Sequence, residues 1–254
     1  MVIKSILEIT SFLTIIPVDR FSKKNDLENI SKNMYLFPIV GLVIGILSIP
    51  ITIFSFYFFD HLVSGFIITI FLIIITGLHH TDALADFADG IMAKGGKEKK
   101  YKVIHDPIIS TAGVVAIISY IIGMILTISS FNGLEGLIVS LLISEIIAKY
   151  AMVLQAYYSQ SAWEGYSSLF TKNMKSNRKI VIATTITVIL IILVEQMIQA
   201  ILIQVLVTGI VCCFILIYIS KKNFGGVTGD VMGATNEIVR ICCLISSSTA
   251  ISIR

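Results

Sequence analysis

Charged residues are scarce in this sequence: Asp, Glu, Lys and Arg make up 14% of its 254 positions, and the formal net charge is +3. A soluble globular protein carries roughly a quarter charged residues. Hydrophobic residues make up 56% of the chain and fall in long runs. The shortage of charge therefore excludes an ordinary water-soluble globule and predicts that much of the surface faces lipid.

The sequence also lacks the cysteine spacing of a zinc site. Its four cysteines form two adjacent pairs, at 212–213 and 242–243, inside apolar segments. No CxxC spacing or nearby histidine completes a site, so we predict that they are buried small apolar residues. A cleavable signal peptide is not evident, because Glu8 interrupts the first apolar patch and no small-x-small pattern follows it.

The long apolar runs predict membrane-spanning helices. A bilayer core of about 30 Å requires roughly 20 apolar residues per helix, and the stretch 6–17 is too short for this. We predict an all-α, polytopic transmembrane bundle with six or seven spans, forming a single domain over residues 1–254. The six clear runs are 35–59, 62–78, 108–130, 134–156, 180–194 and 198–220, and a seventh, 231–253, is interrupted by polar residues.

Every second connection between the predicted spans lacks Lys and Arg. The other connections, with the amino-terminal segment, hold sixteen of the nineteen basic residues. The positive-inside rule assigns such loops to the cytoplasm, so we predict a cytoplasmic amino terminus in the cell membrane. The lysine-rich loop 94–100 could hold an anionic substrate, but lysines beside membranes usually fix topology or meet anionic lipid.

Three aspartates, Asp82, Asp86 and Asp89, follow the second apolar run at spacings of i, i+4 and i+7. On a helix that spacing places their side chains on one face. Like charges so placed repel, and isolated carboxylates at the edge of a bilayer are costly. A bound cation would remove both costs, and oxygen ligands favour Mg²⁺ or Mn²⁺. We predict a metal site here; a solvated acidic helix end is the simpler alternative.

Histidines lie on both sides of these aspartates. His79 and His80 precede them and could bind phosphate or shuttle a proton, although an ordinary interfacial hydrogen bond would also explain them. His105, Asp106 and Pro107 precede the third run. Because proline suits the first turn of a helix, Asp106 could simply be its N-cap. Function and capping both remain open for this segment.

A glycine-rich turn precedes the last predicted helix, and its backbone amides could approach a phosphate closely. Asp230 and Glu237 follow at a spacing of i, i+7, which places them on one helical face. By the predicted topology this turn reaches the same cytoplasmic face as the three aspartates. We therefore predict one site built from both segments. The turn residues are Gly225, Gly226, Thr228 and Gly229.

Together these motifs resemble those of the cobalamin synthase family of membrane transferases, over nearly the whole chain. Residues 80–90 match the family's H-x-D-G-x-A-D-x-x-D-G except that Ala83 replaces a glycine, and residues 225–237 match G-G-x-T-G-D-x-x-G-A-x-x-E. Shorter matches lie at 13–18 and 37–45. The family's D-S-R-x-G-T-x-G is altered at 106–113, where the arginine and first glycine are missing, so a nearby lysine or histidine would have to replace that arginine.

The resemblance implies transfer of the adenosylcobinamide-phosphoryl group from adenosylcobinamide-GDP to α-ribazole or its 5′-phosphate, with release of GMP. Such a displacement needs charge neutralisation more than covalent help. We expect Mg²⁺ to be held by Asp82, Asp86, Asp89 and Asp230, and Asp89 or Asp230 to accept the hydroxyl proton. His80 is a further catalytic candidate. The expected partners are the two small-molecule substrates, the lipid bilayer and a second copy of the chain, without nucleic acid.

Two other functions compete with this interpretation. CDP-alcohol phosphotransferases also use spaced aspartates and Mg²⁺, but their D-G-x-x-A-R core needs an arginine where this chain has Asp86. A transporter would carry ionisable residues near the middle of the bilayer on broken helices. Glu145 and Lys149, in the fourth predicted span, favour a transporter, although they could instead neutralise each other inside the bundle.

Overall fold

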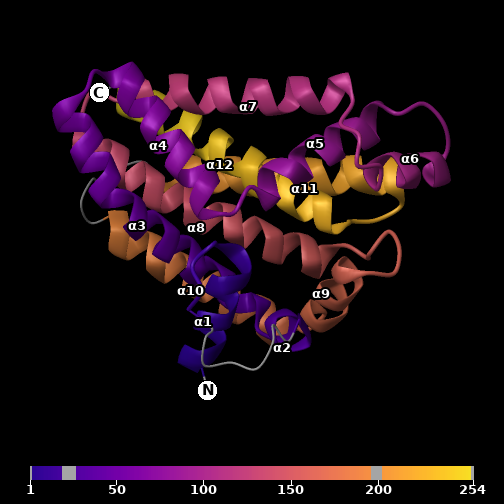
Figure 1. Cartoon of the computed structure of the whole chain (residues 1–254). Helices are drawn as coiled ribbons and strands as arrows, with labels where there is room; N and C mark the ends of the chain where they lie inside the picture. The colour runs from indigo at the N-terminus through magenta and orange to yellow at the C-terminus, as the bar shows by residue number, and fades with distance from the viewer. Residues whose placement is uncertain (1, 19–26, 196–201, 253–254) are drawn as a thin grey trace.

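The computed structural model describes residues 2–18, 27–195 and 202–252. Within these ranges the chain is helical, and no strand is present apart from an isolated bridge between Ser161 and Val227. Figure 1 shows long helices running side by side, with the short helices α1, α2, α6 and α9 around them. The prediction of an all-α bundle is confirmed.

The helices follow one another with short connections. Their bounds are α1 (Val2–Leu13), α2 (Leu27–Lys32), the 3-10 helix η1 (Met34–Leu36), α3 (Phe37–Phe58), α4 (His61–Ile75), α5 (His79–Met92), α6 (Lys97–Ile104), α7 (Thr111–Ser129), α8 (Leu134–Tyr158), α9 (Tyr166–Met174), α10 (Asn177–Glu195), α11 (Leu202–Phe224) and α12 (Gly229–Ser252).

Five helical segments in the described ranges are long and apolar enough to cross a membrane: η1 with α3, then α7, α8, α10 and α11. The bent pair α4 and α5 makes a sixth if it counts as one broken span. Large hydrophobic side chains such as Phe54, Ile118 and Val207 are exposed on these helices. Since water would disfavour so much exposed apolar surface, the protein is a membrane protein.

The predicted second span, 62–78, is shorter in the structure. Helix α4 ends at Ile75, and α5 begins at His79 after a bend of 90°. Gly77 and Leu78 have positive φ angles of 70° and 64°, and their N–H groups donate to the carbonyls of Ile74 and Ile73. This is the hydrogen-bond pattern of a Schellman C-cap, in which glycine adopts the left-handed conformation without strain.

Helix α8 forms the centre of the bundle. Almost all of its span is buried, and it contacts α3 and α12 more extensively than its other neighbours. Small residues permit the close approach: a side chain at Gly41 would overlap the backbone carbonyl of Glu145. Because backbones approach closely only where side chains are small, Gly41 permits the close contact between α3 and α8.

The seventh predicted span becomes α12, a 24-residue helix that is not among the candidate spans. It packs against α8, α5, α11 and α7, and its polar residues Asn236, Glu237 and Arg240 are fully buried. These polar side chains therefore face other helices rather than lipid.

The cysteine prediction is confirmed for Cys213 and Cys243, which are buried, whereas the other two thiols are half-buried and likewise free.

Candidate active site

The aspartate-bearing helix α5 is held in place by α12 and α7, which it contacts most extensively. Ala83 of α5 meets Gly233 of α12, where a side chain would begin 2.5 Å from the Cβ of Ala83. The small residues therefore let the two helices touch. This contact brings the first turn of α12, with Asp230, beside the aspartates of α5.

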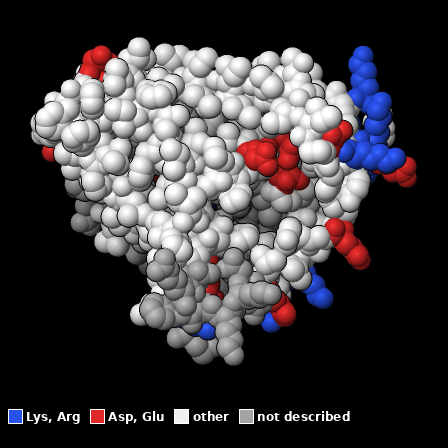
Figure 2. Space-filling view, viewed as in Figure 1, with Lys and Arg blue, Asp and Glu red and all other residues white. Residues whose placement is uncertain are grey.

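The structure brings together the four predicted metal-binding aspartates, here called the acidic cluster: Asp82, Asp86, Asp89 and Asp230. The carboxylate of Asp86 interacts electrostatically with the other three. Asp82 is exposed and Asp86 and Asp230 are partly exposed, whereas Asp89 is buried. Figure 2 shows a patch of acidic side chains on the face where α5 lies in Figure 1. The predicted convergence of two distant segments is therefore present.

Asp89 is bonded differently from its neighbours. Its carboxylate accepts hydrogen bonds from the N–H groups of Ser110, at 2.7 Å, and Gly113, at 2.6 Å, and from the hydroxyl of Ser110. These groups belong to the amino-terminal turn of α7, which favours a negative charge. Asp89 thus connects α7 to α5.

The suggestion that Asp106 caps α7 is wrong, because Ser110 is the N-cap and Asp106 accepts instead from the N–H of Ile108.

Asp230 lies in the first turn of α12, outside the candidate spans. The hydroxyl of Thr228 donates to its carboxylate at 3.3 Å and accepts from the N–H of Val231. Burial raises the pKa of Asp230, and the charge of Asp82 raises it further, whereas His105 acts in the opposite direction. The carboxylate therefore lies in a strongly acidic environment that a cation would stabilise.

The glycine-rich turn divides into packed and open positions. A side chain at Gly226 would overlap the backbone of Gln160, and Thr228 is buried. Gly229 is exposed, with no neighbouring atom near the position of an added Cβ. At Gly225, whose φ is 91°, the ammonium group of Lys97 would lie 2.8 Å from such a Cβ. Gly229 is thus the open glycine of this turn, whereas the side chain of Lys97 covers Gly225.

Two of the histidines named from the sequence, His80 and His105, occupy contrasting sites. His80 is buried, and its Nδ1 lies 3.1 Å from the amide nitrogen of Asn236. His105 ends α6, where its ring packs against Tyr101 and Trp163, and its charge acts on both Asp86 and Asp230. His105 was named from the sequence but not included among the predicted catalytic or metal-binding residues. Its sequence signals were its place in the His105-Asp106-Pro107 segment and the need for a lysine or histidine near the missing arginine.

A second group of ionisable residues lies deeper in the bundle and is here called the buried ionic network. Arg240 is within 2.5 Å of carboxylate oxygens of both Glu145 and Glu237 and donates to the hydroxyl of Tyr120. Lys149 donates to Asn236 at 2.5 Å but lies 4.0 Å from Glu145. The members of the network are His80, Tyr120, Glu145, Lys149, Asn236, Glu237 and Arg240.

The network changes two expectations from the sequence. Lys149 is only a distant partner of Glu145, whose closer partner is Arg240. Glu237 does not join Asp230 in the acidic cluster, because its side chain is fully buried against Arg240. The charges inside the bundle are thus largely matched with one another, which lowers the cost of placing them there.

The acidic cluster does not enclose a ready-made metal cage. Within the described part of the chain, no group of three or more His, Cys, Asp or Glu side chains is arranged to hold a metal ion. Mg²⁺, however, usually keeps several waters and takes one or two carboxylates together with substrate phosphates. Asp82 and Asp86, one turn apart and coupled to Asp230, fit an ion of this kind. The donor set fits a site that substrate completes.

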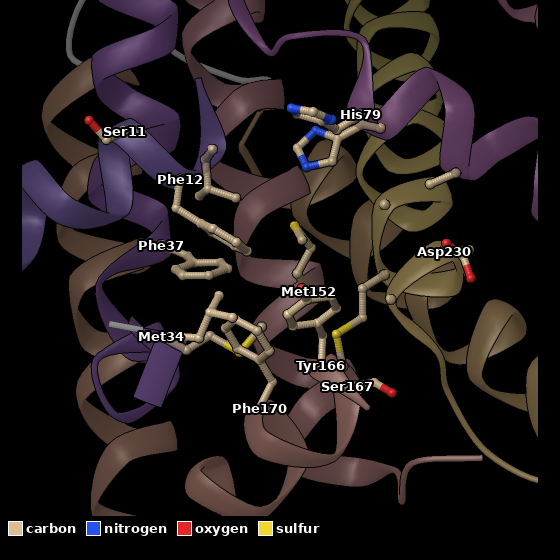
Figure 3. A pocket seen from close by; sticks show the side chains of 17 residues that line it. Ser11, Phe12, Met34, Phe37, His79, Met152, Tyr166, Ser167, Phe170 and Asp230 are labelled. Atoms are coloured by element: carbon tan, nitrogen blue, oxygen red, sulfur yellow. The ribbon is translucent and has the colours of Figure 1, made fainter. Parts of the chain in front are cut away.

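A cavity of about 560 Å³ adjoins the acidic cluster. Its lining residues come from α1, α2, η1, α5, α8 and α9 and from the first turns of α3 and α12. Figure 3 shows Phe12, Phe37 and Phe170 together on one side of this cavity, with His79 and Asp230 away from them. Asp230 therefore belongs both to the cavity and to the acidic cluster.

The chain matches a family model described as cobalamin-5-phosphate synthase over residues 5–248. A curated protein named adenosylcobinamide-GDP ribazoletransferase from Methanococcoides burtonii is 32% identical over 95% of this chain and 90% of its own length. Proteins of the same name from Caldanaerobacter subterraneus and Thermococcus kodakarensis are each 33% identical, over 96% and 93% of this chain and 97% and 95% of their own lengths. No solved structure matches the chain.

Proposed function

The chain belongs to the cobalamin-5-phosphate synthase family, and we propose that it acts as an adenosylcobinamide-GDP ribazoletransferase, the name of its curated relatives. The observation that links this function to particular residues is the electrostatic interaction of Asp86 with Asp82, Asp89 and Asp230. These carboxylates come from two helices far apart in the sequence. They meet on an open face beside a cavity, where two substrates could be brought together.

In the proposed reaction a ribazole hydroxyl oxygen attacks the phosphorus atom that carries the adenosylcobinamide group. A new phosphorus–oxygen bond forms to ribazole, and the bond between that phosphorus and the GMP oxygen breaks. GMP leaves, and the hydroxyl proton passes to a base. The protein's main tasks are to align the two substrates and to offset the negative charge of the diphosphate.

Magnesium is the proposed cofactor, with Asp82 and Asp86 as its direct carboxylate ligands and Asp230 beside them. Bound there, it would neutralise charge on the diphosphate and on the departing GMP. Asp89 is assigned a supporting role because three hydrogen bonds from the start of α7 already engage its carboxylate. That anchoring keeps the face of α5 that carries Asp82 and Asp86 in position.

Asp230 is the proposed base. Its partly exposed carboxylate lines the cavity and interacts with Asp82 and Asp86. An acceptor hydroxyl in the cavity could therefore approach Asp230 without leaving the neighbourhood of the cluster. His80 is a less suitable base, because its Nδ1 faces Asn236 and Glu237 in the buried ionic network.

Lys97 and His105 are the proposed replacements for the arginine that this chain lacks. Lys97 lies over Gly225, and His105 acts electrostatically on Asp86 and Asp230. Lys97 begins α6 and His105 follows its last residue, and the position of α6 is fixed by Lys100. The ammonium group of Lys100 donates to the carbonyls of Gly90 and Ile91 at the end of α5, where a cation is favourable.

The proposed location is the cell membrane, with the active site facing the cytoplasm. Figure 2 shows basic side chains at the end of the bundle where α6 and α9 lie, whereas the end at which α3 meets α4 shows acidic side chains alone. The positive-inside rule supports a cytoplasmic position for the basic end. Self-association remains a prediction.

The decisive test is to incubate the detergent-solubilised protein with adenosylcobinamide-GDP, α-ribazole and Mg²⁺ and to measure the corrinoid product and GMP. Equal amounts of both, abolished by a chelator and restored by excess Mg²⁺, are expected. A transporter would release no GMP. The transporter interpretation also loses its main support, since Glu145 is ion-paired with Arg240. A protein that binds both substrates without forming product would contradict the proposal.

A further inference from the structure

The cavity beside the acidic cluster has two chemically different ends. Its closed end is walled by apolar side chains from three parts of the chain, of which Met34 and Phe37 are almost completely buried. Its open end carries the exposed side chain of His79 and the exposed backbone of Gly229, with Asp230 beside them. A ligand that fits this cavity must therefore be apolar at one end and polar at the other.

The apolar end is built from aromatic rings. Phe12 of α1 stacks on Phe170 of α9, with ring centroids 5.9 Å apart and planes inclined by 26°, and Phe37 meets Phe170 edge to face at 6.1 Å. Figure 3 shows these rings facing the same space, with Met34 and Met152 nearby. Aromatic rings and polarisable thioethers favour a flat, apolar ring system as ligand.

Polar groups are few at this end and are the hydroxyls of Tyr166, Ser11 and Ser167. Ser11 and Ser167 line the cavity, but the hydroxyl of Ser11 donates to the carbonyl of Ile16, and that of Ser167 pairs with Ser161. A guanine ring would bring several hydrogen-bonding groups among these side chains without partners, which is costly. The corrinoid, with amide groups around its rim, would meet the same penalty.

From these observations we propose that the cavity is the acceptor subsite, which holds the benzimidazole ring of ribazole against Phe12, Phe37 and Phe170 and directs its ribose toward Asp230. This inference rests on the proposed function. A cavity of about 560 Å³ lies in the usual range for small-molecule sites, roughly 300–1,000 Å³. The donor would then occupy the open face of the acidic cluster, on the other side of Asp230.

Asp230 connects the proposed acceptor subsite to the acidic cluster. Asp230 lines the cavity and is also coupled to Asp82 and Asp86. A ribose pointing out of the aromatic end would place its hydroxyl beside this carboxylate and near the diphosphate. Two separate subsites that meet at one residue would let the substrates bind independently and react where they meet.

The first test is steady-state kinetics of the full-length Phe12→Ala variant. Removing a ring that stacks on a base is expected to raise the KM for ribazole by about tenfold or more, while the KM for adenosylcobinamide-GDP stays unchanged. The matched control is Leu7→Ala, which alters an exposed side chain of the same helix that does not line the cavity. An increase in the KM of the donor instead would overturn the inference.

The second test needs no variant and no turnover. A benzimidazole riboside carrying a photoreactive azide on its ring is irradiated with the wild-type protein, and the labelled peptides are identified by mass spectrometry. Labels on residues 11–13, 34–37 or 166–170, reduced by excess ribazole, are expected. Labels confined to other segments would overturn the inference. Labels on these segments without any transferase activity would support the ribazole-binding subsite and contradict the proposed function. Failure of the subsite proposal can therefore be distinguished from failure of the proposed function.

Discussion

Helices α5 and α12 contribute to both the acidic cluster and the buried ionic network, which α7 and α8 complete, yet the two regions differ in burial and in how their charges are paired. Helix α5 supplies His80 to the network and Asp82 to the cluster, and α12 supplies Glu237 to the network and Asp230 to the cluster. In the network, Arg240 contacts both glutamates. Within the described ranges, no Lys or Arg forms an ion pair with an aspartate of the cluster.

The difference shows how one pair of helices can carry both a structural and a catalytic set of charges. Charges that are matched inside the bundle neutralise one another, so they offer little net charge to a ligand. Unmatched carboxylates near the surface are costly until a cation arrives, which makes them suitable for binding one. We expect substitutions in the network to affect folding and substitutions in the cluster to affect chemistry.

The largest expected effect is on stability, from Arg240→Met. This change leaves Glu145 and Glu237 buried without their main cation, and removal of one partner from a buried ion pair typically costs about 3–5 kcal/mol. We expect a strongly reduced melting temperature in detergent. The companion variant also carries Glu145→Gln and Glu237→Gln and should recover much of the loss. An unchanged melting temperature for the single variant would remove the distinction between the two regions.

A large effect on turnover, with little effect on stability, is expected from Asp86→Asn. Loss of a group that offsets transition-state charge commonly lowers kcat by about 10²–10³-fold, and the carboxylate is partly exposed, so folding should be preserved. The assay is GMP release, with thermal unfolding measured alongside. Glu135→Gln is the control, because that exposed carboxylate lies in the first turn of α8, outside the cluster, the cavity and the motifs. Near-normal turnover of Asp86→Asn would refute the proposed metal role.

A moderate effect is expected in the pH profile. Burial raises the pKa of Asp230 above its ordinary value of 3.8, so its carboxyl group remains protonated at a higher pH than a free aspartate does. The acid limb of kcat/KM should therefore lie above that value. Higher Mg²⁺ stabilises the ionised form and should move the limb to lower pH.

The control for the pH measurement is an equal ionic strength of potassium chloride, which should move the limb much less than Mg²⁺ does. If the acid limb of kcat/KM stays at the same pH when Mg²⁺ is raised, the titrating group lies outside the acidic cluster.

The smallest effect is expected from Lys97→Ala, since exposed charges contribute about 0–1 kcal/mol. The KM for adenosylcobinamide-GDP should rise by about two- to fivefold, and the KM for ribazole should not change. Lys99→Ala on the same helix is the comparison, because Lys99 lies over Gly95 instead of Gly225. Equal effects of the two substitutions would assign Lys97 a general electrostatic role rather than a contact with the donor.

Several features of the fold could be predicted because they depend on local pattern. The apolar runs predicted the helices that could cross a membrane, and the spacing of Asp82, Asp86 and Asp89 predicted their common helix. The end of α4 was also readable in principle, since Gly77 is a typical C′ residue. Its significance was missed because the apolar run continues through Leu78.

The site was predicted less completely, because it depends on contacts between segments distant in sequence. The motifs indicated that Asp82, Asp86, Asp89 and Asp230 meet. The same motifs did not indicate that Asp89 anchors α7, that His80 faces Asn236, or that His105 acts on the cluster. Residue type and spacing are the same for a free carboxylate and for one already engaged by neighbouring donors.

The sequence by itself determined that this is a helical membrane protein with an acidic site near its basic end, because hydropathy, charge bias and helical spacing are properties of neighbouring residues. Only the tertiary structure decided which charges are neutralised, where the aromatic cavity lies and that Asp230 joins the cavity to the acidic cluster. Burial and electrostatic coupling arise when distant helices pack, and no local pattern specifies them.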